Sequence, residues 1–513
     1  MPDSGTIPDN VMQLIESGAD DAPALHAPDR PNLTYAGLRR QIDATVTQLN
    51  ALGIGRNMAV AIVLPNGPEM ASAFVSIAAG ATTAPLNPAY RAEEFEFYLD
   101  DLEADLLVVQ DGDATPARAA AERLGIPIAT LKFSTDEPAG VFTLAGDGTG
   151  PPLDAKRAGL AEPDDVALVL HTSGTTSRPK IVPLSQRNVC ASALHIADTL
   201  ALTPDDQCLN VMPLFHIHGL IAAVLASLYA GASITCTAGF NALRFFALLK
   251  EFAPTWYTAV PTMHQAILDR ATRNRDIVEA AELRFIRSSS ASLPPQVMGA
   301  LEATFDAPVI EAYGMTEAAH QMACNPLPPR DRKPGTVGIA AGPDVAIMND
   351  ANELLAAGDI GEVVIRGPNV TAGYRNNDTA NADSFSAGWF RTGDQGVIDA
   401  DGYLRLTGRL KEIIYRGGEK FSPREVDEVI LDHPGVAQMV TFAVPHAKLG
   451  ESVAAAIVVA DGAEVSDADI RDFARSRLAD FKVPEQVLFL DEIPKGATGK
   501  LQRIGLAEKL GLA

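Results

Sequence analysis

The sequence predicts an α/β fold, with a large N-terminal domain of helix-covered β-sheets followed by a small α+β C-terminal domain. This prediction rests on hydrophobic patterning. From about residue 31 to residue 365, short apolar runs alternate with helical patterns, as in sheets that are covered by helices. After residue 365, shorter alternating runs and Gly-containing turns replace that pattern. A length of 513 residues is sufficient for both units.

Individual elements of the large domain follow from the same patterning. The continuous apolar run at residues 58–64 (MAVAIVL) predicts a strand buried on both faces, and residues 69–79 read as the helix that follows it. Residues 106–109 and 166–170 are further buried-strand candidates. Residues 140–163, which are rich in Gly, Pro, Asp and Ala, predict an exposed connection.

The later part of the chain gives turn and helix signals. Residues 326–334 (PLPPRDRKP) predict an extended loop. Turns are expected at residues 401–402 (DG) and 416–418 (RGG). Helical patterns return at residues 423–431 and 466–478, so the last hundred or so residues are expected to form the small α+β unit.

Composition and charge exclude several classes of function. The 41 Lys and Arg residues against 65 Asp and Glu residues give a formal charge of −24. Such an acidic chain is unsuited to general nucleic-acid binding or to docking on an anionic membrane. The longest apolar stretch, residues 220–230, is too short to span a bilayer, and no apolar signal core is found at the N-terminus. The sequence therefore predicts a cytoplasmic protein without a membrane span.

The cysteines point to a reducing compartment. Cys190, Cys208, Cys236 and Cys324 are widely and irregularly spaced, and no C-x-x-C pair occurs. So few cysteines in so long a chain build neither a disulfide scaffold nor a zinc ribbon. We expect reduced, mostly buried thiols.

A run of small hydroxylated residues follows the predicted strand at 166–170. Residues 172–177 read TSGTTS, and Lys180 comes shortly after. Backbone N–H groups around a glycine, hydroxyl donors and a lysine charge together favour an anion such as phosphate. The Walker A spacing occurs nowhere in the chain, so this loop is a different kind of phosphate site.

The loop and four further segments together resemble the adenylate-forming superfamily, which includes acyl-CoA synthetases, nonribosomal adenylation domains and luciferases. The segments occur in the order of that superfamily and span roughly residues 30–505, so the resemblance implies the adenylate-forming enzyme fold. They are residues 172–180 (TSGTTSRPK), 313–317 (YGMTE), 389–394 (WFRTGD), 408–412 (GRLKE) and 494–500 (PKGATGK).

The resemblance implies a two-step reaction. A carboxylic acid attacks the α-phosphate of ATP to give acyl-AMP and pyrophosphate, and a thiol, usually coenzyme A, then displaces AMP. Charge develops on the phosphate oxygens in the first step, so electrostatic stabilisation is expected to dominate it. The implied substrates and cofactors are ATP, Mg²⁺, coenzyme A and a small-molecule carboxylic acid.

The resemblance also assigns residues to the nucleotide. Thr172 and Glu317 are implied to lie near the magnesium ion. Asp394 would accept hydrogen bonds from the ribose hydroxyls, Arg409 would hold the same sugar, and Tyr313 would stack on adenine. The other implied nucleotide-binding residues are Ser173, Gly174, Thr175, Thr176 and Lys180 in the loop, and Ser290, Ala291, Ser292, Glu311 and Ala312 on the adenine side.

Four residues are implied to take part in catalysis. Lys500 would reach the α-phosphate and the carboxylate during adenylation, because its charge favours both anions. Thr316 would contact the α-phosphate, and Glu317 would support the metal. His216 lies in residues 213–219 (PLFHIHG), which match the segment that borders the acyl and pantetheine tunnels, at the position near the carboxylate.

A hinge is implied between the two domains. Lys411 stands at the hinge position of the superfamily, so we divide the chain into residues 1–408, a hinge at 409–412 and a mobile domain at 413–513. Family enzymes rotate the small domain between the two half-reactions, which is closure at an element terminus. The residues that this rotation would bring to the thioester site are Gly417, Gly418 and Lys420.

The acid itself is predicted from a few polar residues. His320 is expected near the acyl pocket, three residues after Glu317, with Ser289 facing it and His216 nearby. A serine and a histidine suit a small, polar or doubly charged acid better than a long alkyl chain, because an imidazole can pair with a second carboxylate. A closer resemblance to the oxalyl-CoA synthetase group, carried by the segments HTSGTTSRPK, MPLFHIHGL, SSSASLPP and KPGTVG, favours oxalate or another small dicarboxylate.

One departure from the family pattern concerns the phosphate loop. Ile181 stands where the superfamily nearly always has glycine after the loop lysine. A β-branched residue there stiffens the backbone and adds bulk, so we expect an effect on loop geometry or on rate.

Other functions remain open at this point. A medium- or long-chain fatty-acid or aryl-acid CoA ligase requires an apolar lining around His264, Ser289 and His320. An acyl-AMP ligase that loads a carrier protein is a further alternative, as is a non-catalytic nucleotide-binding scaffold. The protein is expected to be a monomer or a homodimer.

Overall fold

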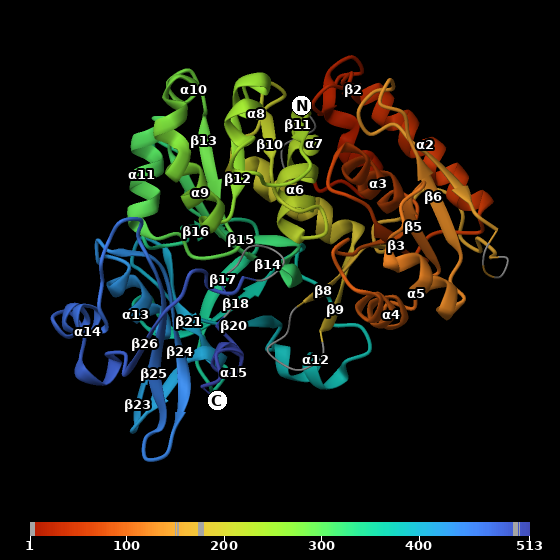
Figure 1. Cartoon of the computed structure of the whole chain (residues 1–513). Coiled ribbons are helices and arrows are strands. Elements are labelled where there is room, and N and C mark those ends of the chain that lie inside the picture. Colours follow the sequence, from red (N-terminus) through yellow and green to blue (C-terminus); the bar gives the residue numbers. More distant parts are fainter. Residues whose placement is uncertain are drawn as a thin grey trace.

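The computed structural model describes residues 6–148, 150, 153–172, 179–495, 501 and 503–512 (Figure 1). It confirms a large N-terminal domain of mixed sheets and helices and a smaller C-terminal domain. The loop residues from Ser173 to Ser177, together with Gly496, Thr498, Gly499 and Lys500, lie outside the described residues.

The large domain contains two extended sheets that are mainly parallel. In the first, β7 and β9 pair antiparallel at the two edges and the strands between them are parallel. In order across this sheet, its described strands are β7 (Thr143–Gly146), β6 (Ile128–Lys132), β5 (Leu106–Gln110), β3 (Ala59–Val63), β4 (Thr82–Pro85), β8 (Val166–Thr172) and β9 (Lys180–Ser185).

The second sheet is parallel from β1 to β14 and changes direction at its ends, where β14 pairs antiparallel with β15 and β1 with β2. In order, its described strands are β16 (Ile339–Ala340), β15 (His320–Cys324), β14 (Val309–Met315), β13 (Phe285–Ser288), β12 (Trp256–Ala259), β10 (Gln207–Asn210), β11 (Ser233–Cys236), β1 (Pro23–His26) and β2 (Leu33–Thr34).

Apolar helices fill the space between these two sheets. Helix α3 contacts β4 of the first sheet and β11 of the second, and α6 contacts β8 of the first and β15 of the second. Every described side chain of α3 from Met70 onward is buried, as expected for a helix covered on all sides. The helices of this part are α1 (Val11–Leu14), α2 (Tyr35–Ala51), α3 (Pro68–Ala78), α4 (Ala92–Asp101), α5 (Pro116–Leu124), α6 (Gln186–Thr199), α7 (Ala226–Tyr229), α8 (Phe245–Phe252), α9 (Pro261–Ala271), α10 (Arg275–Glu279) and α11 (Pro295–Phe305).

Two smaller sheets lie further along the chain. One connects the large domain to the rest and contains β17 (Asp344–Met348), β18 (Ile360–Arg366), β20 (Trp389–Ile398), β19 (Phe385–Ser386) and β21 (Leu404–Arg409), with α12 (Asp378–Ser384). The other belongs to the C-terminal domain and contains β23 (Glu419–Phe421), β22 (Ile414–Arg416), β25 (Gly450–Val459), β24 (Val436–His446) and β26 (Gln486–Phe489), with α13 (Pro423–Ile430), α14 (Asp467–Arg475) and α15 (Leu506–Lys509).

Short tighter or wider helical turns complete the described structure. The 3₁₀ turns are Ile15–Ser17, Thr272–Asn274, Thr316–Ala318, Leu410–Glu412 and Asp480–Lys482, and His218–Leu225 is a π-helix. A π-helix is rare and is found frequently at functional sites.

Most sequence predictions of elements are confirmed. The strands expected at residues 58–64, 106–109 and 166–170 are β3, β5 and β8, and the helices expected at 423–431 and 466–478 are α13 and α14. The tight turn at Gly417-Gly418 separates β22 from β23, and both glycines have positive φ (60° and 95°).

One prediction was wrong in part. Residues 140–163 are not simply an exposed connection, because they contain β7, which pairs antiparallel with β6, and the buried Phe142 and Ala161. The two glycines and the aspartate near this strand dominated its composition and concealed the short Thr143–Gly146 segment.

The thiols and the helices bear on two further expectations. All four cysteines are free and buried, as predicted. In the part of the chain that the structure describes, no helix has both the length and the apolar character needed to cross a membrane.

The close approach of β14 and β15 gives a test of the fold. Gly314 faces the carbonyl of His320, and a Cβ at position 314 would lie 1.8 Å from that oxygen. Gly314→Ala must therefore separate the two strands, and we expect it to lower the free energy of unfolding by roughly 1–3 kcal/mol, as overpacking does. Thermal unfolding of the purified variant measures the effect.

A matched control is available in helix α11. A Cβ at Gly299 would meet nothing within 4 Å, so Gly299→Ala should leave the melting temperature unchanged or raise it. Equal melting temperatures for the two variants would contradict the packing argument.

Candidate active site

The first group of predicted nucleotide-binding residues meets at the end of β14. The Tyr313 hydroxyl donates a hydrogen bond to Asp394 Oδ2 (2.5 Å), and Arg409 Nε lies 3.0 Å from Asp394 Oδ1. Asp394 and Arg409 face each other because β20 and β21 pair at that register. Burial is the main cause that raises the pKa of Tyr313, so its hydroxyl remains a donor. Tyr313 and Asp394 are buried and Arg409 is about half exposed, so the three side chains form one polar unit at the surface of the domain. Their roles toward the nucleotide stay predictions.

The second group surrounds Glu317, which follows β14 in a 3₁₀ turn. The carboxylate is 6% exposed, and its Oε1 accepts a hydrogen bond from the Tyr374 hydroxyl (2.8 Å). Lys180 Nζ lies 4.3 Å from the centre of the Tyr374 ring. Burial raises the pKa of Glu317, while the Tyr374 hydrogen bond and the Lys180 charge act in the opposite direction. Burial likewise lowers the pKa of Lys180, and Glu317 opposes that shift.

This arrangement suits a magnesium ion that is held mainly by phosphate and water. Among the described residues, no group of three or more His, Cys, Asp or Glu side chains is placed to hold a metal ion. Mg²⁺ is usually bound by one or two carboxylates together with substrate phosphates. Glu317 supplies one such carboxylate, and Thr172 stands at the end of β8, opposite Lys180 of β9.

The predicted adenine side lies where β13 and β14 end. Ala291 and Ser292 are exposed, whereas Ala312 is buried. Glu311 is 2% exposed, and its Oε1 accepts a hydrogen bond from the Leu293 backbone N–H (2.9 Å). Its Oε2 is buried without a hydrogen-bond partner among the described residues. Burial therefore raises the pKa of Glu311 to about 7.

A third group, which the motifs indicated only in part, lies beside β14. His218 and His320 stack with ring centres 5.0 Å apart, and the Arg287 guanidinium donates to Nε2 of each ring (3.3 and 3.2 Å). His218 Nε2 also lies 2.6 Å from Thr258 Oγ1, and His218 Nδ1 lies 3.0 Å from Ser290 Oγ. All of these groups except Ser290 are buried.

His320 begins strand β15, opposite Met315 of β14, and is 1% exposed. The chain turns sharply after Ala318 and returns as this strand, which brings His320 beside the ring of His218. Its location near the acyl pocket stays a prediction.

The other predicted acid-site residues have these positions. Ser289 is buried, and its hydroxyl donates to the Ala312 carbonyl (2.9 Å), so it joins β13 to β14. The serine that contacts an imidazole is Ser290, and that imidazole belongs to His218. His216 Nδ1 accepts a hydrogen bond from the His218 backbone N–H (3.3 Å), at the N-terminus of the π-helix.

Ile181 fits its position as a strand residue. It pairs with His171 in the β8–β9 ladder, is 5% exposed and packs in an apolar cluster with Val169. A β-branched side chain suits such a strand. Its effect on the preceding loop stays a prediction, because residues 173–178 lie outside the described part.

The predicted hinge segment lies between β21 and β22. Lys411 is exposed in the 3₁₀ turn Leu410–Glu412, and Gly417, Gly418 and Lys420 are exposed on the β22–β23 hairpin, at the far end of the C-terminal domain in Figure 1. The neighbouring Glu412 Oε2 accepts a hydrogen bond from Arg503 (2.7 Å).

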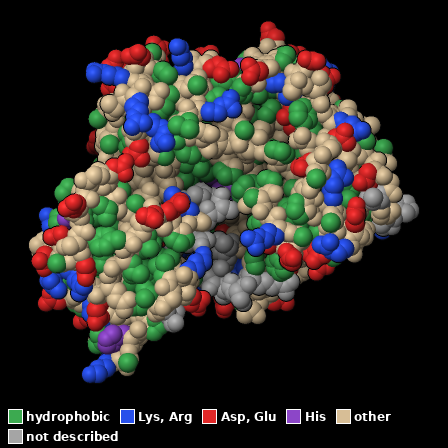
Figure 2. Space-filling model, in the orientation of Figure 1, with side chains coloured by type: hydrophobic (Ala, Val, Ile, Leu, Met, Phe, Trp, Pro, Cys, Tyr) green, Lys and Arg blue, Asp and Glu red, His purple; other side chains and the backbone are tan. Residues whose placement is uncertain are grey.

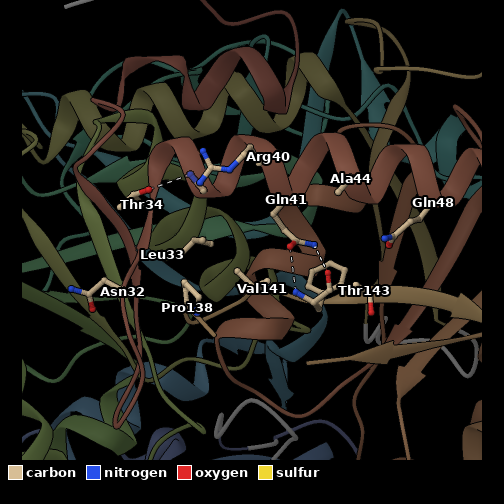
Figure 3. Close-up of a pocket in the computed structure, with 12 residues that line it drawn as sticks. Asn32, Leu33, Thr34, Arg40, Gln41, Ala44, Gln48, Pro138, Val141 and Thr143 are labelled. Carbon is tan, nitrogen blue, oxygen red and sulfur yellow. Dashed lines mark hydrogen bonds between the residues drawn. The ribbon is translucent and has the colours of Figure 1, made fainter. Parts of the chain in front are cut away.

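Figure 2 shows a hollow between the C-terminal domain and the upper part of the large domain. A separate surface groove of about 410 Å³ lies along α2, where Gln41 exchanges hydrogen bonds with the Phe142 backbone (Figure 3). None of the predicted site residues lines that second groove.

Two models of known protein families match the chain. A model of the "AMP-binding enzyme" family matches residues 16–375, and a model of the "AMP-binding enzyme C-terminal domain" matches residues 425–500. The chain belongs to the AMP-binding enzyme family. The first matched range includes Glu317, Tyr374 and Arg287.

Several members of the family are similar over nearly their whole length. The oxalate–CoA ligase of Arabidopsis thaliana is 46% identical, with 96% of this chain and 97% of that protein covered. The oxalate–CoA ligase of Saccharomyces cerevisiae is 42% identical, with 88% and 87% covered. The probable CoA ligase CCL9 of Humulus lupulus is 48% identical, with 93% and 91% covered.

Solved structures of AMP-binding enzymes share the fold. ATP-bound MatB from Rhodopseudomonas palustris has a TM-score of 0.86 at 29% identity, with 98% of each chain covered. The apo structure of the same protein has a TM-score of 0.76. The arrangement of this chain is therefore more similar to the ATP-bound structure than to the apo structure.

Sequence reasoning missed Tyr374, Arg287, Thr258 and the role of His218 in this AMP-binding enzyme. His218 lay inside the segment 213–219, but His216 was chosen from it. Arg287 directly precedes the serine run at 288–290, and a charged residue at the end of an apolar strand was the available signal. Tyr374 follows Gly373 without a motif that the sequence analysis used.

The buried carboxyl of Glu311 gives a pH-dependent test of the AMP-binding enzyme. Its folded-state pKa of about 7 lies above the unfolded value of 4.5, so the native state keeps a proton that the unfolded state has released. Stability is therefore lost as the pH rises from about 4.5 to 7, by an amount on the order of 3 kcal/mol. We expect Glu311→Gln, which cannot ionise, to be more stable than the wild type at pH 8 but not at pH 5.

Melting temperatures of the nucleotide-free proteins between pH 5 and pH 8 measure this difference. The exposed Glu282→Gln variant controls for the loss of one carboxylate. A difference between Glu311→Gln and the wild type that stays constant with pH would show that Glu311 is ionised throughout.

Proposed function

We propose that the chain is an AMP-forming acid–CoA ligase whose acid is oxalate or another small dicarboxylate. It activates the acid with ATP to give acyl-AMP and pyrophosphate, and then transfers the acyl group to coenzyme A with release of AMP. The observation that carries the reaction is the convergence of the Tyr313–Asp394–Arg409 unit and the Lys180–Tyr374–Glu317 unit on one end of β14. Oxalate is favoured by the relatives that are named oxalate–CoA ligases.

Each unit has a defined part in adenylation. Asp394 accepts hydrogen bonds from the ribose hydroxyls, and Arg409 fixes the orientation of its carboxylate. Glu317 and Thr172 would hold Mg²⁺, which when bound neutralises charge on the phosphate oxygens. Lys180 faces the same region and supplies a fixed positive charge that costs no reorganisation during the reaction. Thr316 precedes Glu317 in the same turn and contacts the α-phosphate.

We further propose that the chain works as residues 1–408, a hinge at 409–412 and a mobile domain at 413–513. Arg503 supports this division, because its guanidinium contacts Glu412 in the hinge and Asp427 at the core of the C-terminal domain. Arg503 follows Lys500 by three positions in the sequence. The higher TM-score with the ATP-bound relative is consistent with an arrangement suited to adenylation.

The rival substrates are less well supported. A fatty or aryl acid needs an apolar lining, but the buried side chains beside β14 include His218, His320 and Arg287. His264 is buried next to Tyr257, and burial lowers its pKa to about 3, so it is a neutral core residue. Carrier-protein loading and a non-catalytic scaffold are alternatives without a supporting observation. A cytoplasmic location and a monomeric or homodimeric state stay predictions.

A panel of acids tests the proposed function. The purified protein is incubated with ATP, Mg²⁺, coenzyme A and one acid at a time: oxalate, malonate, succinate, octanoate, benzoate or 4-coumarate. We expect pyrophosphate release with oxalate, accompanied by AMP and oxalyl-CoA, because His218, His320 and Arg287 make the proposed acid side polar. Release with octanoate or an aryl acid but not with a dicarboxylate would keep the ligase mechanism and reject the proposed acid.

The Tyr374 hydroxyl gives a second test, directed at Glu317. Tyr374→Phe removes the donor to the buried carboxylate but keeps the ring that contacts Lys180. A hydrogen bond to a charged group contributes about 1.5–3 kcal/mol, so we expect kcat/KM for pyrophosphate release to fall roughly tenfold or more. Because that hydrogen bond also lowers the pKa of Glu317, the acidic limb of the pH–rate profile should move to higher pH.

Tyr403→Phe is a matched control for this substitution. Tyr403 also donates through its hydroxyl, to the Asp331 carbonyl (2.5 Å), and also has a lysine over its ring, Lys333 at 4.4 Å. It contacts none of the predicted site residues through these groups, so its kcat/KM should equal that of the wild type. An equal fall in both variants would assign the effect to general loss of stability.

A further inference from the structure

A buried arginine without a carboxylate partner lies beside the proposed acid site. Arg287, which is 0% exposed, is in β13, and its guanidinium donates to His218, His320 and Gln321 Oε1 (3.3 Å). Its Nε has no hydrogen-bond partner among the described residues. Within the same described part of the chain, Arg287 makes no ion pair with an aspartate or glutamate.

Such an unpaired charge is costly. An ionised group that is removed from water normally has a counter-charge and a full set of hydrogen bonds, because the desolvation penalty is several kcal/mol per ion. The titratable side chains that act on Arg287 are the thiols of Cys324 and Cys208, and burial raises the pKa of both, so both thiols are neutral. The positive charge is therefore left uncompensated by the described residues.

The hydrogen bonds around Arg287 also fix the two imidazoles. A guanidinium can only donate, so Nε2 of His218 and Nε2 of His320 must each present a lone pair. Both rings are then neutral, with the proton on Nδ1. For His218 this proton points to Ser290 Oγ, while the Thr258 hydroxyl donates to Nε2. Arg287 thus sets the tautomers of the two stacked imidazoles and holds its positive charge in contact with both rings.

The backbone around this group is strained. Ser290, Ala319 and His320 all have positive φ (73°, 46° and 103°), and His218 is the first residue of the π-helix. Each such residue costs on the order of 1–3 kcal/mol, and this kind of strain is found at ligand and active sites. Ser290 contacts His218, and His320 is itself one of the two imidazoles, so the strain is concentrated at the group that Arg287 orients.

We propose that Arg287 is a specificity-determining positioning residue for the acid, whose buried positive charge is balanced by the second carboxylate of a dicarboxylic acid. It acts through His218 and His320, the two imidazoles to which its guanidinium donates hydrogen bonds. A monocarboxylic acid leaves the charge uncompensated once its own carboxylate is consumed in the acyl-phosphate bond. This inference rests on the proposed acid–CoA ligase function and deepens it by assigning the acid class to named residues.

The test compares oxalate with oxamate, an acid of nearly the same size in which a neutral amide replaces one carboxylate. The kcat and KM for oxalate and the inhibition constant of oxamate against oxalate are measured for the wild type, Arg287→Met and Arg287→Lys. Losing one partner of a buried charge pair costs about 2–5 kcal/mol, so we expect Arg287→Met to raise the KM for oxalate roughly 30-fold or more. The inhibition constant of oxamate should change less than threefold.

Arg287→Lys distinguishes charge from shape. Lysine keeps the charge but not the planar pair of donors that holds both imidazoles. We expect its KM for oxalate to lie between the values for the wild type and Arg287→Met, and its kcat to stay below that of the wild type. Should Arg287→Met not fold, a Lys variant that binds oxalate and oxamate with the wild-type preference would support the charge, and one that has lost the preference would overturn it.

Arg284→Met is the matched control. Arg284 lies just before β13 and is already paired with Asp206 (2.9 Å), so its removal should leave the preference for oxalate over oxamate unchanged. The inference is overturned if Arg287→Met weakens the binding of oxalate and of oxamate equally. It is also overturned if Arg284→Met changes the preference for oxalate as much as Arg287→Met does.

The wild-type arm separates this inference from the proposed function. If the wild type activates malonate but not oxalate, only oxalate is excluded as the acid. The Arg287 comparison is then made with malonate and malonamate. A wild type that activates only monocarboxylic acids rejects the proposed acid class and the role of Arg287 together. A wild type that uses oxalate while Arg287→Met keeps its preference rejects the role of Arg287 only.

Discussion

The antiparallel return from β14 to β15 is the constraint on which the active site depends. β14 is the last parallel strand of its sheet, and the 3₁₀ turn Thr316–Ala318 reverses the chain directly beyond it. The turn carries Glu317 toward Tyr374, and the strand before it carries Tyr313 toward Asp394. The strand after it brings His320 back beside Met315. One reversal therefore places the residues that are proposed for the nucleotide, the metal and the acid within a few positions of each other.

The charges around this reversal are compensated in two different ways. Asp394 has both carboxylate oxygens engaged, one by Tyr313 and the other by Arg409, so it is oriented before any ribose binds. Glu317 is held by the Tyr374 hydroxyl and faces Lys180. Arg287 lacks an anionic partner of this kind in the described residues. Asp394 and Glu317 thus have oppositely charged or hydrogen-bonding partners within the protein. The charge of Arg287 is balanced, in our proposal, only when an anion binds.

Much of this site was predictable from contiguous motifs, because they record residues that a single loop or strand presents. The YGMTE segment gave Tyr313 and Glu317, and the WFRTGD segment gave Asp394. Tyr374 and Arg287 were not predictable in this way, because each meets its partner from a segment that is distant in sequence: Tyr374 meets Glu317 across 57 positions and Arg287 meets His320 across 33. A sequence pattern contains no record of such contacts.

The fold was predictable to a similar extent, and the predictions of individual elements that failed did so for related reasons. Buried parallel strands such as β3 and β5 read as continuous apolar runs, because both of their faces are covered. The edge strand β7 has one buried position in four, so its pattern gave no signal. The sequence located His320 only by its three-residue distance from Glu317, whereas positive φ at Ala319 and His320 ends the 3₁₀ turn at once and begins strand β15. Local spacing does not reveal a residue in the left-handed region.

The acidity of the whole chain and the chemistry of its site act over different distances. A formal charge of −24 repels ATP, coenzyme A and a dicarboxylate alike, but charges farther apart than about 8 Å are largely screened at physiological ionic strength. Inside the site, Lys180, Arg409 and Arg287 act at contact distance and in a medium of low dielectric. Recognition of anions therefore depends on these few buried or half-buried cations, and composition alone predicted the exclusion of nucleic acid without predicting the class of small anion that is bound.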